Sequence, residues 1–223
     1  MALAYPTLLF VHLLLFVLWL GADVGVFVLG QHFRKHTIYT LDQRLALLKL
    51  LVEVDMVPRS AWALMVPISL SIVRLGGFWL MPGWLLAGAW MLGAIWLWLV
   101  WDAHRHDQTP RAKRNRAIEL YLKIALAVFY LALGGVSLAN GAPLTEPWLA
   151  TKALLFGFIF AAAIMIDVVF KPVGPLLMRL VAEGSSVATE VPLLRTMNNT
   201  RWWVWTVYLL LVITAYLGLV KPF

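Results

Sequence analysis

Six long apolar stretches constrain this chain more than any other feature, since each is long enough to cross a lipid bilayer as a helix. They lie near residues 7–30, 57–77, 79–101, 117–139, 148–171 and 202–220. A helix needs about 20 apolar residues to span a bilayer, and in lipid its backbone must satisfy its own hydrogen bonds. The chain is 62% hydrophobic and only 13% charged over 223 residues, which excludes a sizeable soluble domain. We therefore predict an all-α, six-span membrane bundle, a single domain over 1–223 surrounded by the lipid bilayer.

Basic residues are concentrated in alternate connections, 31–50, 102–116 and 171–201, and are nearly missing from the others. Short loops rich in Lys and Arg stay on the cytoplasmic side. This places the first, third and fifth connections inside and both termini outside. The cytoplasmic location of these connections thus explains the net charge of +7, and we expect no nucleic-acid partner.

Two connections need a structure of their own. Residues 41–56 carry apolar residues at helical spacing among charges, which predicts an interfacial helix or a cytoplasmic extension of the second span, ended or kinked at Pro58. Residues 102–116 are expected to form a cytoplasmic loop, and residues 172–200 a second one that contains a short interfacial helix. The Gly76-Gly77 pair predicts a tight turn between the second and third spans.

The first span carries polar residues that lipid would not tolerate. At about 100° per residue, His12, Trp19 and Asp23 share one helix face. Charged groups cost about 2–3 kcal/mol or more at the bilayer centre, so this face must look into the bundle. Asp23 and Arg59 both belong to the inner half of the membrane, which predicts a buried ion pair between them. Two i,i+4 pairs are also predicted, Glu119 with Lys123 and Asp167 with Lys171.

His12 and Lys152 enter the membrane from the same side. Each lies about five residues into its span, so both are expected roughly 7 Å below the outer boundary. His12 either bonds a neighbouring helix or binds a metal or haem. Lys152 either extends to the interface or lies beside His12. Since His12 is the single histidine inside a predicted span, we do not expect two histidine ligands there.

Other candidate sites are weaker. The chain has no cysteine, which excludes thiolate metal sites and disulfides. His104 and His106 stand beside carboxylates in a basic loop, where interaction with solvent is favoured over metal binding. Trp90 and Trp96, in the middle of the Trp-rich third span, are interpreted as packing residues rather than as a cofactor cage.

Several of these features, in order along the chain, resemble the HemJ-type protoporphyrinogen oxidases and the related CopD-like membrane proteins. His12 followed by Leu-rich turns and Trp19 is similar to the first helix of that family, and residues 45–67 are similar to its second. The run 147–152, PWLATK, resembles the entry to the helix with the family's functional lysine, and the ending VKPF resembles the family's C-terminus. One place departs: where the family has an Asn-Glu pair before the last helix, residues 197–200 read MNNT.

The resemblance implies a haem b inside the bundle, in a multi-pass protein of a bacterial-type inner membrane. It implies His12 as the axial and metal-binding ligand and Lys152 as the second ligand or catalytic partner. Trp19, Trp148 and Arg74 would complete the cofactor site, with Arg74 pairing with a propionate. The implied activity is oxidation of a tetrapyrrole or a related electron transfer in the membrane. The membrane setting suggests a quinone or a respiratory protein as the electron acceptor, and a homo-oligomer is a further expectation. The alternative is a cofactor-free structural or accessory subunit, or a small transporter, whose buried polar residues hold the helices together.

Overall fold

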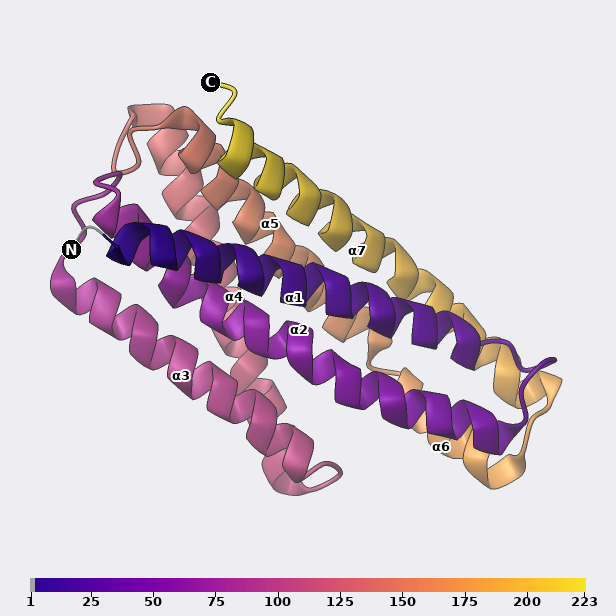
Figure 1. The fold of residues 1–223 in the computed structure, drawn as a ribbon. Helices are drawn as coiled ribbons and strands as arrows, with labels where there is room; N and C mark the ends of the chain where they lie inside the picture. Colours follow the sequence, from indigo (N-terminus) through magenta and orange to yellow (C-terminus); the bar gives the residue numbers. More distant parts are fainter. Residues whose placement is uncertain (1–2) are drawn as a thin grey trace.

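The computed structural model describes residues 3–223, which form an all-α helical bundle (Figure 1). Its helices are α1 (Ala4–Phe33), α2 (Leu41–Leu75), α3 (Gly83–Arg105), α4 (Pro110–Asn140), α5 (Pro147–Phe170), α6 (Val173–Glu183) and α7 (Val187–Val220). Six stretches are long and apolar enough to cross a membrane: α1, α2, α3, α4, the α5–α6 segment and α7. The predicted fold class and its number of spans are confirmed.

The connections are shorter than the hydropathy pattern predicts. The predicted loop 102–116 is reduced to residues 106–109, because Thr109 caps α4 and Pro110 occupies its first turn. The predicted loop 172–200 holds the expected short helix, α6, but most of the remainder belongs to α7. That helix begins at Val187, where Ser186 and Thr189 form a capping box. Polar caps therefore set these helix ends, well outside the apolar windows.

Helix α2 is continuous, so the interfacial helix predicted for 41–56 is the first half of a longer helix. It begins at a capping box of Thr40 and Gln43 and runs through Pro58 and Pro67 without ending. Proline removes one helix hydrogen bond, but neighbouring helices can compensate for that loss in a membrane bundle. The most apolar window of α2 is 67% buried, more than that of any other span. Packing against the neighbouring helices therefore keeps α2 continuous at Pro58, where the sequence alone predicts an end or a kink.

The bundle is built around α2. Helix α1 packs along α2, α3 packs on its other side, α4 packs on α5, and α5 packs on α7. The start of α1 and the end of α7 lie at one end of the bundle, and the start of α2, helix α6 and the start of α7 lie at the opposite end (Figure 1). The core between them is aromatic: Trp62 stacks on Trp19 at 5.3 Å and meets Trp96 at 5.0 Å and Phe160 at 4.8 Å between ring centroids.

Two glycines allow α4 and α5 to approach each other closely. A Cβ on Gly134 would come within 2.7 Å of the Leu154 Cα, and a Cβ on Gly157 would come within 2.8 Å of the Leu131 backbone nitrogen. Small residues permit such contacts between membrane helices, where apolar side chains alone provide little driving force. The close approach brings the polar side chains of α4 and α5 together.

We expect Gly134→Ala to lower the free energy of unfolding by about 1–3 kcal/mol, because the added methyl group would push against the backbone of α5. Thermal unfolding in detergent measures the change. Gly135→Ala is the matched control, since a Cβ there meets nothing within 4 Å. The control should leave stability unchanged or raise it by up to about 1 kcal/mol. Equal effects of the two substitutions would contradict the close packing.

Candidate functional site

The first of two polar sites lies near the terminal end of the bundle, where His12 faces α2. The His12 Nδ1 atom is 3.4 Å from the Ser69 hydroxyl oxygen, and that hydroxyl donates its own hydrogen to the Met65 carbonyl at 2.5 Å. Because the Ser69 hydrogen is already used, Nδ1–H of His12 is the donor in their contact. The neutral ring then presents the lone pair of Nε2. The prediction that the polar face of α1 looks inward is confirmed here.

Lys152 belongs to the same region. Its Nζ lies against Gly218 of α7, where a Cβ would be only 2.5 Å away. The lysine is close enough to His12 for its charge to act on the imidazole, and both side chains are half-buried. Four helices thus contribute to what we call the His12 site, composed of His12, Ser69, Lys152 and Gly218. The structure places both predicted ligands in this region of the bundle.

The other residues predicted to bind a cofactor are more scattered. Trp148 is buried against Phe78, 5.6 Å between ring centroids, with the Lys221 ammonium 5.1 Å from its ring. Arg74 is exposed at the C-terminal end of α2, near the start of α3. Trp19 lies deeper in the bundle, stacked on Trp62, two turns along α1 from His12. Trp148 and Arg74 share the terminal end with His12, but Trp19 lines the second site.

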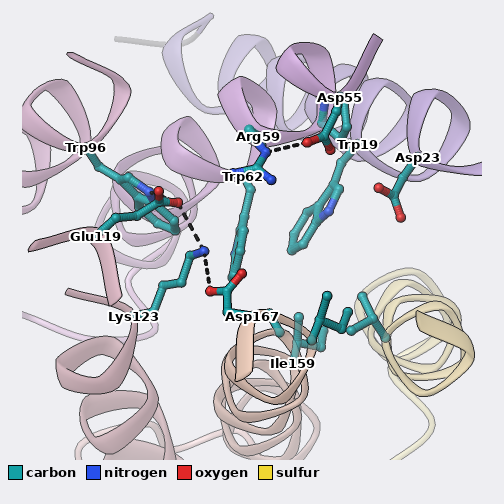
Figure 2. A pocket seen from close by; sticks show the side chains of 14 residues that line it. Trp19, Asp23, Asp55, Arg59, Trp62, Trp96, Glu119, Lys123, Ile159 and Asp167 are labelled. Atoms are coloured by element: carbon teal, nitrogen blue, oxygen red, sulfur yellow. Dashed lines mark hydrogen bonds and ion pairs between the residues drawn. The ribbon is translucent and has the colours of Figure 1, made fainter. Parts of the chain in front are cut away.

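The second site is a partly open cavity of about 110 Å³ toward the opposite end of the bundle, which we call the acidic cavity (Figure 2). It is lined by residues of α1, α2, α3, α4, α5 and α7. Its charged lining residues are Asp23, Asp55, Arg59, Glu119, Lys123 and Asp167, and its aromatic walls are Trp19, Trp62 and Trp96. Neither His12 nor Lys152 lines it. The two sites are therefore separate, with the aromatic core around Trp62 between them.

Lys123 is the best-paired charge in the acidic cavity. Its ammonium is 3.0 Å from Glu119 and 3.0 Å from Asp167, and its side chain is only 6% exposed. The predicted Glu119–Lys123 pair is confirmed. The predicted Asp167–Lys171 pair is wrong, because Asp167 turns toward α4 and binds Lys123 across the helix contact. Trp96 also donates to Glu119 at 3.3 Å, so that tryptophan packs and bonds inside the bundle.

The predicted Asp23–Arg59 ion pair is wrong as well. Arg59 donates through Nε to Asp55, one turn earlier on its own helix, at 2.5 Å. Among residues 3–223, Asp23 makes no ion pair within 4 Å, although its carboxylate lines the cavity. Its backbone oxygen accepts a hydrogen bond from the Tyr208 hydroxyl at 2.9 Å. A partner on the same helix is closer to Arg59 than a partner on α1, which explains the failure.

His106 and the neighbouring Asp102 bind other groups of the chain. The Nδ1 atom of His106 bonds the backbone oxygen of Asp102 at 3.0 Å, and the Asp102 carboxylate is occupied by Arg111 and Asn115. Burial raises the pKa of Asp107, but hydrogen bonds from Arg116 and Gln108 outweigh it, and the pKa lies below its ordinary value. Within the described residues, no group of three or more His, Asp or Glu side chains is arranged to hold a metal ion. The solvated interpretation of this loop agrees with these contacts.

Comparisons with protein-family models, with curated proteins and with solved structures found no match. The function of the chain is therefore inferred from the geometry of the two sites and from the sequence resemblance.

Proposed function

We propose that this chain is a haem b redox protein of a bacterial-type inner membrane, with both termini outside, and that His12 is an axial ligand. The observation that carries the proposal is the contact from His12 to Ser69, which directs the free Nε2 lone pair away from α2. Ligand histidines usually donate their other ring N–H to a fixed acceptor, as His12 does. The porphyrin itself supplies four nitrogen ligands, so one or two side chains suffice.

The surrounding residues suit such a group. Gly218 leaves the space that the Lys152 amine occupies, in the same region of the bundle as His12. Lys152 would act as the second ligand or as the partner that holds a proton at Nζ. Arg74, exposed near the terminal end, would bind a propionate, and Trp148 would close the apolar wall. When bound, haem supplies reversible one-electron chemistry, and the chain supplies its ligands and a dry environment.

In a membrane, the electron acceptor would be a quinone or a respiratory protein. The resemblance favours a tetrapyrrole as the electron donor. Residues 197–200 lack the glutamate that the family has at this place. This difference argues against a tetrapyrrole as the electron donor more than it argues against haem binding. Expression in a strain that lacks protoporphyrinogen oxidase separates these possibilities. Growth without added haem would support oxidation of the tetrapyrrole. Haem binding without rescue would leave electron transfer as the function.

The test of haem binding is the Soret absorption band of protein purified after expression with ample haem. We expect His12→Ala to abolish the band, and Ser69→Ala to weaken haem affinity by about 10- to 100-fold, as for other groups that orient a ligand histidine. His32→Ala is the matched control: it lies on the same helix, and its Nδ1 is 2.8 Å from the Tyr39 hydroxyl. Colourless wild-type protein would contradict the proposal and favour the cofactor-free alternative.

A further inference from the structure

The acidic cavity carries more negative charge than its own cations balance. Four carboxylates line it, from Asp23, Asp55, Glu119 and Asp167, against the two cations Arg59 and Lys123. Fully ionised, the lining has a net charge of −2. Unbalanced charge inside an apolar bundle is costly. An ammonium group from outside the chain would relieve part of that cost by pairing with one of these carboxylates.

Lys123 shows that the lining of the cavity can hold an ammonium group. Its ammonium lies between two carboxylates and 5.5 Å from the centroid of the Trp62 ring. Carboxylates together with a tryptophan face are an established way to hold an ammonium group. Across the cavity, Asp23 and Trp19 also bring a carboxylate and a tryptophan to the lining, and there Asp23 has no cation of the described chain as a partner (Figure 2).

Two further features identify the rest of the ligand. Arg59 uses only Nε to bind Asp55, and its two terminal amino groups make no hydrogen bond to the described residues, while the side chain is 44% exposed. The two terminal amino groups of an exposed guanidinium can bind a phosphate while Nε stays on its carboxylate. Trp62, only 8% exposed, also lines the cavity, and its Nε1–H has no acceptor within residues 3–223. A ligand oxygen would satisfy it.

The position of the cavity agrees with a headgroup. Asp55 and Arg59 flank the start of the apolar run at 57, and Asp167 lies one turn before the end of α5, so the charged lining is close to a membrane boundary. Exposure of Arg59 at 44% and of Asp167 at 38% marks the mouth, while Glu119 and Lys123 lie at the floor with 7% and 6%. A volume of about 110 Å³ holds several water molecules, and hence a group of a few non-hydrogen atoms.

We propose that the acidic cavity binds a phosphoethanolamine group, with the ammonium beside Asp23 and Trp19 and the phosphate on Arg59. This site is independent of the His12 site and of haem binding. Its ligand chemistry occurs in the headgroup of a membrane phospholipid and in free phosphoethanolamine. Choline has three additional methyl groups and no N–H to donate, so it fits the carboxylates and the small volume less well.

The experiment is native mass spectrometry of delipidated protein titrated with phosphatidylethanolamine, phosphatidylcholine and phosphatidylglycerol. We expect phosphatidylethanolamine to bind at least about tenfold more tightly than the other two, from the loss of one charged hydrogen bond. Asp23→Asn should remove that preference, whereas Arg59→Gln should weaken the binding of all three lipids, because all three carry the phosphate. Asp42→Asn, which changes an exposed carboxylate at the start of α2, is the matched control and should retain the preference.

Competition with soluble phosphoethanolamine distinguishes the two sources. If it displaces the lipid, the headgroup alone is recognised, and if it does not, the lipid is the ligand. Equal binding of the three lipids by the wild-type protein would overturn the proposal and needs no variant to fold. A folded Asp23→Asn protein that keeps the preference would also overturn it.

Discussion

Replacing Arg44 by methionine is expected to lower the free energy of unfolding by about 3–5 kcal/mol, because it leaves a buried carboxylate without its partner. Arg44 is 1% exposed and binds Glu190 with both terminal amino groups, at 2.5 and 2.9 Å. Its Nε donates to the Phe33 carbonyl at 2.7 Å. This one side chain joins the end of α1, the start of α2 and the start of α7.

Thermal or denaturant unfolding in detergent measures this effect. Arg179→Met is the control, since the Arg179–Glu183 pair has about the same chemistry but is half-exposed. An exposed pair contributes about 0–1 kcal/mol. If both variants lost the same stability, the interior position of Arg44 would not matter, contrary to this account.

Lys123→Met is expected to have an effect of similar size, also about 3–5 kcal/mol, because Glu119 and Asp167 would then share a cavity without a cation between them. Lys171→Met is the control, since Lys171 is exposed and forms no ion pair in the described chain. The triple variant Lys123→Met, Glu119→Gln, Asp167→Asn should recover much of the loss, because no ionised group of the triad remains buried. A triple variant as unstable as the single one would indicate that packing, not charge, explains the loss.

Hydropathy was sufficient to predict the number of spans, and helical periodicity was sufficient to predict the inward face of α1. Both follow from one cause, the cost of exposing polar groups to lipid. The expectation that His12 and Lys152 lie at matching depth rests on the same cause, because depth is counted in residues from a boundary. The predicted helix ends failed wherever a cap such as Thr109 or Ser186 extended a helix beyond its apolar window.

The pairing of charges could not be predicted from the sequence. Arg59 binds Asp55 and Lys123 binds Asp167 because of how side chains turn and how closely α4 and α5 approach. That approach depends on Gly134 and Gly157, whose role is visible only when the two helices are seen together. The signal that could have pointed to the acidic cavity was the presence of ionisable residues near the same end of four spans.

The lengths of α2 and α7 have a consequence for the profile of the protein across the membrane. At 35 and 34 residues they measure about 50 Å, against a hydrocarbon core of about 30 Å. Their excess lies at the same end, where Arg44 clamps them to each other, and α6 adds mass beside them (Figure 1). In side view, one end of the molecule should lie close to the surface of one leaflet, and the other end should extend about 20 Å beyond the hydrocarbon core into the solvent.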